Sequence, residues 1–304
     1  MSGIISTGSF PQDLRPGIRM WFGSAYRLYD TKYDKILDVK VPDDRAYEED
    51  VTMSTFGLAQ VKSQGAPVTY DTTNQLYTTR YDHIQYGLGF VITQEMMDDG
   101  IALKLGEVFS KAMKQSMLRS REIISANVYV NGFSSSYLMN GGDGVALFSN
   151  AHPSQAGNLT NVPASPASLS EAALEQMVID VQAFKDNRGQ LIMTKPDKLI
   201  VPTALQFTAA RILDSVLQSN TANNNINALR DLGMLPGGVV VNPYLSSASN
   251  WFVKTDEEGL NFFNRKDITL SDDNEFDTEN GKFKALMRLS VGWSDWRAGY
   301  GVNA

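Results

Sequence analysis

The chain has 304 residues and carries 27 basic against 34 acidic side chains, which gives a formal net charge of -7. That length is enough for one large domain or two modest ones, and 42% hydrophobic and 20% charged residues are typical of a globular protein. The absence of cysteine excludes disulfides and thiolate chemistry, and the acidic balance is not that of a typical nucleic-acid-binding protein.

The first forty or so residues are rich in turn-forming and aromatic residues. Pro11, Pro16 and Gly17 interrupt any regular pattern, and residues 1–10 lack the basic and apolar regions of a secretory signal. Aromatic side chains without regular spacing indicate an arm that packs against another surface, either of its own domain or of something else. These side chains are Trp21, Phe22, Tyr26, Tyr29 and Tyr33.

Residues 48–81 predict a projecting β-hairpin. Strand-like runs at 51–56, 58–62, 68–70 and 77–81 are separated by glycine, proline and asparagine turn signals. Many of these residues are polar and β-branched, so the hairpin has little apolar surface of its own to bury. An extended projection of this kind is typical of a segment that binds a partner.

A strand and a long helix follow directly. Residues 84–92 alternate apolar and other residues, as in a half-buried strand, and residues 283–293 show a similar pattern, so we expect these two strands to pair. From about Thr93 to Asn131 the spacing predicts an amphipathic helix, although Gly100 can delay its start to about residue 101. Thirty residues of helix span roughly 45 Å, the length of a spine along which other elements pack.

We expect the apolar stripe of this helix to comprise Leu105, Phe109, Ala112, Met113, Met117, Ile123, Ile124 and Val128. Charged residues, among them Lys114, Arg121 and Glu122, are expected to lie mostly off the stripe.

A second domain is predicted after a polar, proline-containing linker that ends near residue 168. Ser168 and Glu171 match a capping box, in which the serine begins a helix and the glutamate three residues later bonds back. Pro202 suits the first position of another helix. Short apolar runs at 191–193, 199–201, 239–241 and 251–253 predict strands, so the region has the alternation of an α/β domain.

Motifs for catalysis or metal binding are weak. The two histidines, His83 and His152, lie in different predicted elements, and His152 before Pro153 is better interpreted as fixing a turn than as a ligand. The GGDG sequence at 141–144 lacks the Lys-Ser/Thr of a phosphate-binding loop, and the acidic residues of 272–279 do not fit an EF-hand. Asp98 and Asp99 favour a helix start rather than a catalytic pair. We therefore predict no enzyme, no catalytic or metal-binding residues, no cofactor and no membrane span.

Several segments, in this order, resemble those of the Mu-like major head subunit family of tailed-phage major capsid proteins. They are RPGI at 15–18, WFG at 21–23, LFSNAHP at 147–153, DNRG at 186–189, PDKLIVPTAL at 196–205 and RAGYG at 297–301. Each is moderately specific, and their order and spacing carry the resemblance, which covers nearly the whole chain.

The resemblance implies an α+β protein with the Hong Kong 97-type capsid fold. It divides the chain into an N-terminal arm (1–47), an extended loop (48–81), a peripheral domain (82–159) with its spine helix at about 93–131, an α/β axial domain (160–265) and a return to the peripheral domain (266–304) with a C-terminal strand. The long helical N-terminal extension that some relatives carry is not seen, so a separate scaffold or an earlier processing step is expected. No glutamate matches the covalent crosslinking chemistry of the fold's founding member.

The implied function is that of a shell subunit, assembled in the host bacterial cytoplasm and located in the virion. It forms pentameric and hexameric capsomers around double-stranded DNA, with scaffolding, portal and possible decoration proteins as partners. Expected contacts between subunits are Trp21, Phe22, Leu58, Val61, Lys62, Val68, Tyr70 and Tyr77. The alternatives are an encapsulin-like compartment shell of the same fold and an enzyme or sugar-binding protein.

Overall fold

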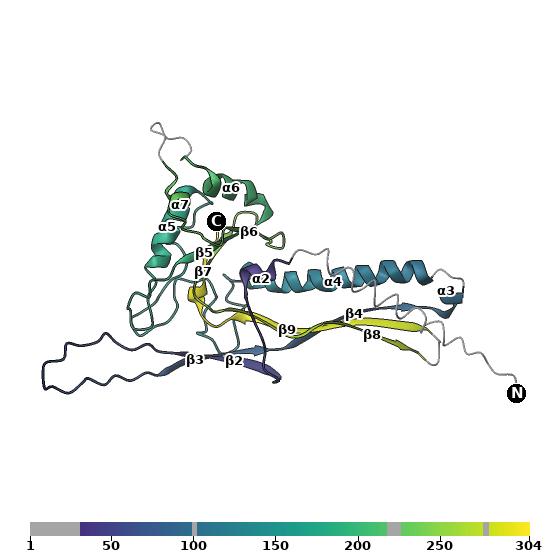
Figure 1. The fold of residues 1–304 in the computed structure, drawn as a ribbon, viewed down its shortest axis with the longest axis horizontal. Helices are drawn as coiled ribbons and strands as arrows, with labels where there is room; N and C mark the ends of the chain where they lie inside the picture. Colours follow the sequence, from purple (N-terminus) through teal and green to yellow (C-terminus); the bar gives the residue numbers. More distant parts are fainter. Residues whose placement is uncertain (1–30, 99–101, 218–225, 276–279) are drawn as a thin grey trace.

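The computed structural model describes residues 31–98, 102–217, 226–275 and 280–304. Figure 1 shows three parts: a long sheet with helix α4 lying along it, a second region of shorter strands and helices at one end of that helix, and a hairpin that projects beyond this end. The expected arm residues Trp21 and Phe22 lie outside the described residues.

The long sheet has the strand order β1-β8-β9-β4. Its strands are β1 (Asp38–Lys40), β4 (Ile84–Ile92), β8 (Leu260–Asn274) and β9 (Gly281–Trp293). The expected pairing of the two alternating segments is confirmed, because β4 lies antiparallel to β9 with Ile84 opposite Leu289. The 15-residue β8, by contrast, was not predicted, and it includes Asp272 and Asp273, the first of the acidic residues at 272–279.

Helix α4 (Ala102–Val130) covers one face of this sheet, after the short α3 (Gln94–Asp98). Met113, Met117 and Val128 are buried as expected, whereas Phe109 and Ile123 are exposed. The expectation for the charged residues was wrong for three of them, since Lys114, Arg121 and Glu122 are all buried. The buried stripe of the helix is therefore partly polar.

These polar groups bind the segment that leads into β1, which includes α2 (Tyr33–Ile36). The two carboxylate oxygens of Glu122 accept hydrogen bonds from the backbone N–H groups of Lys32 and Tyr33, each at 3.0 Å. The guanidinium of Arg121 lies 4.5 Å from the centre of the Tyr33 ring and 3.3 Å from Asp267. Burial raises the pKa of Glu122 above its usual value, and the two N–H donors oppose that rise.

The second region contains a four-stranded sheet of order β10-β7-β5-β6. Its strands are β5 (Pro196–Val201), β6 (Val239–Val241), β7 (Trp251–Thr255) and β10 (Gly299–Val302). Its helices are α5 (Glu171–Gln182), α6 (Gln206–Asp214), α7 (Ala228–Asp231) and the 3-10 turns η2 (Thr203–Leu205) and η3 (Trp296–Ala298). After β9 in the long sheet the chain crosses back to the second region, where β10 forms an edge strand of the second sheet.

Two local expectations in this region were wrong. The cap of α5 is Ser170, whose hydroxyl accepts a hydrogen bond from the N–H of Ala173, and not Ser168. Residues 191–193 do not form a strand: Leu191 makes only an isolated bridge with Lys185, and Met193 has a φ of 57°. Strands β5, β6 and β7 lie where the sequence predicted them.

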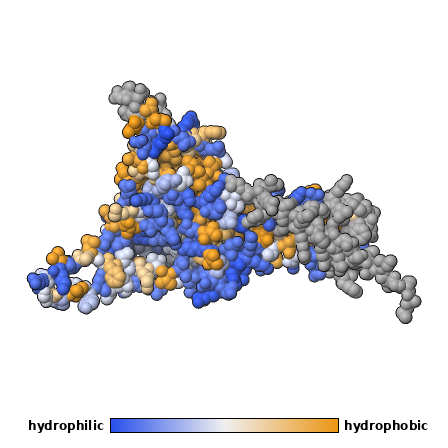
Figure 2. All heavy atoms as spheres, viewed as in Figure 1, coloured by the Kyte–Doolittle hydropathy of each residue, from blue (hydrophilic) through white to orange (hydrophobic). Residues whose placement is uncertain are grey.

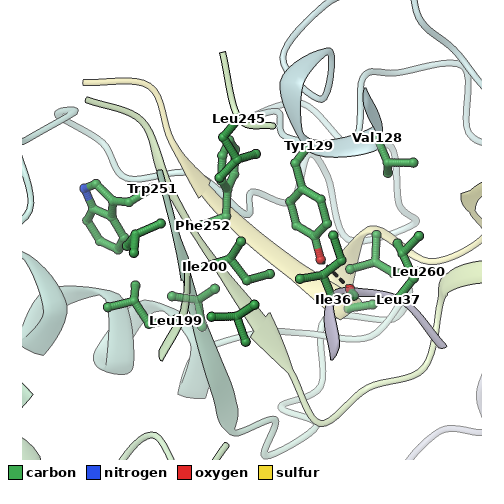
Figure 3. Packing of buried hydrophobic residues seen from close by; sticks show 14 of the residues in the cluster. Ile36, Leu37, Val128, Tyr129, Leu199, Ile200, Leu245, Trp251, Phe252 and Leu260 are labelled. Carbon is green, nitrogen blue, oxygen red and sulfur yellow. Dashed lines mark hydrogen bonds between the residues drawn. The ribbon is translucent and has the colours of Figure 1, made fainter. Parts of the chain in front are cut away.

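One hydrophobic cluster joins the two sheets (Figure 3). The ring of Phe252 on β7 lies 5.3 Å from that of Tyr129 on α4 and 5.2 Å from that of Phe148. The Tyr129 hydroxyl donates a 2.7 Å hydrogen bond to the carbonyl of Ile36. An ideal β-carbon at Gly301 would lie 2.5 Å from the Phe148 ring, so this position on β10 needs a glycine.

The Glu122→Ala substitution tests the polar contact of α4. It removes the two carboxylate oxygens that accept the N–H groups of Lys32 and Tyr33, so we expect the free energy of unfolding to fall by about 1–3 kcal/mol. Urea unfolding of the subunit measures this. The neighbouring Ile123→Ala is the control, because Ile123 is exposed; equal losses in both variants would contradict the contact.

The Gly301→Ala substitution tests the packing of Phe148. Its methyl group would force the ring to move, at an expected cost of about 1–3 kcal/mol. Gly142→Ala is a matched control, because a β-carbon there would lie 3.7 Å from its nearest neighbour. Thermal or urea unfolding measures both variants. A Gly142→Ala variant that is less stable than Gly301→Ala would show that the contact of Gly301 with Phe148 is not tight.

Candidate functional site

The projecting hairpin is the candidate functional site. Strands β2 (Tyr47–Met53) and β3 (Gln75–Asp82) pair antiparallel at its base, with an irregularity between Val51 and Met53. Beyond them, residues 54–74 form neither helix nor strand. The strands expected at 58–62 and 68–70 were therefore wrong for the isolated chain. Figure 1 shows this stretch as the end of the molecule farthest from β4.

The expected contact residues of the loop are strongly exposed. The exposed fractions are 74% for Leu58, 99% for Val61, 59% for Val68 and 92% for Tyr70, and Lys62 is exposed as well. Figure 2 shows hydrophobic residues interspersed with hydrophilic ones along this projection. Tyr77 differs, since it is half-buried and its hydroxyl donates a 3.0 Å hydrogen bond to the carbonyl of Pro153 on the body of the same chain.

A turn after α5 fastens the base of the loop. We call the side chains of Thr55, Asp71, Asp186 and Arg188 the loop anchor. Arg188 donates to the Asp71 carboxylate and to the carbonyl of Thr72, both at 2.7 Å. Asp186 accepts the hydroxyl of Thr55 and, at 2.8 Å, the N–H groups of Arg188 and Gln190. The anchor thus holds both limbs of the loop against one turn.

Both carboxylates of the anchor are held in their charged form. The N–H groups of Gly57 and Thr72, followed by the Arg188 guanidinium, lower the pKa of Asp71 below its usual value. Burial acts to raise the pKa of Asp186, but the hydroxyl of Thr55 and the N–H groups of Gln190 and Arg188 together lower it. The anchor therefore depends on ionised carboxylates.

The sequence analysis assigned no contact role to these four residues. The DNRG segment at 186–189 contributed to the family resemblance, but nothing in the spacing linked it to Thr55 or Asp71, more than a hundred residues earlier. The signal available in the sequence was the aspartate three residues before a glycine, which is typical of a turn. In the structure Gly189 has a φ of 83°, and the Asp186 carboxylate accepts the N–H of Gln190 in the same turn.

The contacts of His152 are those of a buried, packed side chain. It is fully buried, its Nδ1 lies 2.6 Å from an Asp143 oxygen, and its ring stacks on Trp296 at 4.5 Å. The side-chain amide of Asn161 donates to the carbonyls of Leu147, Trp296 and Gly299. These contacts agree with the interpretation that His152 fixes a turn. They also join the LFSNAHP segment at 147–153 to the residues that lead into β10.

The GGDG loop and His83 also have packing roles rather than chemical ones. Gly141, with a φ of 95°, lies so close to the Thr78 carbonyl that a β-carbon would overlap it, which identifies the GGDG loop as a packing element on β3. His83 is buried between Ser290 at 2.9 Å and Glu48 at 3.4 Å. Among the described residues, no group of three histidine, aspartate or glutamate side chains is placed to hold a metal ion, and no helix has the length and apolarity to cross a membrane.

A model of the phage capsid protein family matches residues 76–302. The chain belongs to this family. A comparison with curated protein sequences finds no match. As a phage capsid protein, the chain is a subunit of a self-assembling shell and a component of the virion.

Solved structures with the same fold support this. The capsid of Myoviridae phage XM1 has a TM-score of 0.56 at 10% identity, covering 90% of this chain and 94% of that chain. The capsid of an empty GTA particle has a TM-score of 0.54 at 12% identity, covering 90% of each chain. The virus-like particle from Pyrococcus furiosus has a TM-score of 0.51 at 9% identity, covering 95% and 98%. The expectation of a tailed-phage capsid protein with a mixed Hong Kong 97-type fold is therefore confirmed.

The loop anchor has a predictable pH dependence. Because the folded pKa values of Asp71 and Asp186 are lowered, their stabilisation is complete above about pH 3.9, the usual carboxyl value, and is lost as the pH falls through the folded values. We expect Asp71→Asn to lower the melting temperature at pH 6 and to change it much less near pH 3.

Glu175→Gln is the control for this measurement, because Glu175 is exposed on α5, away from the hairpin base in sequence, and makes no hydrogen bond with the described hairpin residues. An Asp71→Asn effect that is as large near pH 3 as at pH 6 would contradict the ionised anchor.

Proposed function

We propose that the chain is the major head subunit of a tailed double-stranded DNA phage, which assembles through pentameric and hexameric capsomers into an icosahedral shell. The observation that carries this proposal is the anchored, projecting loop with its exposed Leu58, Val61, Val68 and Tyr70. These apolar side chains have no core of their own, and a surface of this kind is typical of a protein–protein contact.

The direction of the loop favours a contact between copies that is not self-complementary. The tip projects from one end of the molecule, while the long sheet extends from the other (Figure 1). A tip that binds a different surface of the next copy makes a head-to-tail contact, and such contacts close into rings when the rotation between copies allows. Rings of five and six subunits are the units that an icosahedral shell requires.

The remaining parts of the proposal rest on charge and on the family. A net charge of -7 gives the subunit little attraction for packaged DNA, so contact with it is non-specific. We propose scaffolding and portal proteins, with or without decoration proteins, as further partners, and assembly in the cytoplasm of the bacterial host. The proposed role is structural, without enzymatic activity: His83 and His152 are both used in packing contacts.

An encapsulin-like compartment is the second candidate function. It is favoured by the likeness to the Pyrococcus furiosus virus-like particle, which covers 95% of this chain. The content of the particles separates the two functions. Particles from phage-infected cells that contain double-stranded DNA support the phage head, whereas DNA-free particles that retain one cargo protein support the compartment.

Replacement of residues 58–69 by a short glycine-serine linker tests the role of the loop. The linker can close because the Gly57 N–H already lies 2.7 Å from the Asp71 carboxylate, so the anchor remains. We expect the variant to melt within a few degrees of the parent and to form no shells, because the tip is removed. Electron microscopy and light scattering measure this.

A variant of full loop length with serine at Leu58, Val61, Val68 and Tyr70 is the matched control for length. We expect it to assemble poorly as well, because the apolar contact is lost. Normal shells from the shortened variant would contradict the role assigned to the loop.

A further inference from the structure

Strand β4 leaves one edge of the long sheet open. In the described part of the chain, β4 is the last strand of the order β1-β8-β9-β4, and only β9 pairs with it. Every second residue of such an edge strand directs its N–H and C=O groups away from the sheet. We call this side of β4 the open edge.

The open edge lacks the features that usually prevent pairing with another chain. Its nine residues, IQYGLGFVI, include no charged residue and no proline, and no bulge interrupts its register with β9. Ile84, Leu88 and Val91 are all about half exposed. Since alternate residues of a strand face opposite ways, Val91 lies on one face of the sheet and Ile84 and Leu88 on the other.

The tip of the hairpin contains a strand-like segment that has no strand to pair with among the described residues. Residues 58–62, LAQVK, have the composition of a strand, yet no backbone hydrogen bond joins them to another described residue. Leu58 and Val61 are three residues apart, so in an extended strand they too would face opposite ways. The other limb of the tip is less suited to pairing, because Pro67 lacks an N–H group.

We propose that residues 58–62 of one copy add a strand to the open edge of β4 in the next copy. The occupant is a second copy because a chain cannot reach its own β4, which runs away from the hairpin tip (Figure 1). The added strand satisfies backbone groups on both sides and places one apolar residue of the tip on each face of the sheet, where β4 also has apolar residues. This inference rests on the proposed shell function and specifies the surface that receives the loop.

Hydrogen–deuterium exchange of the unmodified protein tests the proposal. Peptides that cover residues 58–62 and 84–92 are compared between free subunits and purified shells. In free subunits about half of the β4 amides, those on the open edge, should exchange rapidly. We expect these amides and those of residues 58–62 to exchange at least tenfold more slowly in shells. Intact shells in which either set keeps its rate would overturn the proposal without affecting the shell function; a failure to form any particle would instead overturn the function.

Crosslinking between copies gives an independent readout, because the chain has no cysteine of its own. Copies with Val61→Cys are co-assembled with copies that carry Gln85→Cys, Leu88→Cys or Val91→Cys, and the shells are treated with a short bis-maleimide. We expect covalent heterodimers with the β4 variants, and at least tenfold fewer with Ile179→Cys, an exposed control on α5. Equal yields, or more with the control, would overturn the proposal.

Discussion

The packing of Phe148 is the contact on which the rest of the structure depends. Its ring lies against Tyr129 and Phe133 at the end of α4 and against Phe252 in the second sheet. On the other side it covers Gly299 and Gly301 of β10. A β-carbon at Gly301 would overlap the ring, and one at Gly299 would be in tight contact with it at 3.2 Å. One aromatic side chain thus joins the spine helix, the second sheet and the end of the chain, and it fixes the two regions relative to each other. A shell subunit needs such a fixed shape, because small errors in angle accumulate when the same contact is repeated around a closed assembly.

The fixed body also determines where the hairpin points. The loop anchor attaches the base of the hairpin to the turn at 186–190, which follows α5 in the second region. Among the described residues, the chain beyond the anchor has exposed apolar side chains and backbone without pairing partners, and at the opposite end only β9 pairs with β4. Both features are a liability for a monomer, because exposed strands and apolar patches promote aggregation. In the assembly that we propose, the same features are the contacts between subunits.

The sequence predicted the elements whose patterns are local. The alternation of residues 84–92 and 283–293 was sufficient to predict both strands and their pairing. Strand β8 was missed because its centre, NRKDI at 264–268, breaks the alternation, and two register shifts occur there. The strands expected at 58–62 and 68–70 were predicted because their residues are typical of strands. A strand also needs a neighbouring strand to pair with, and the isolated chain supplies none to these segments within the described residues.

Contacts between distant segments were beyond prediction from pattern. Glu122 is buried because the N–H groups of Lys32 and Tyr33, some ninety residues earlier, supply donors that the helix pattern cannot show. The loop anchor was missed for the same reason, since Arg188 and Asp71 are 117 residues apart in the sequence and only the fold brings them together. The fold class and the exposed loop could therefore be predicted, whereas the residues that position the loop could not.

The particle mass of the purified protein, measured by light scattering together with electron microscopy, tests the central claim most directly. The account predicts closed shells, or rings of five and six subunits, from the protein alone or with a scaffolding protein. A subunit that remains monomeric under both conditions would contradict it.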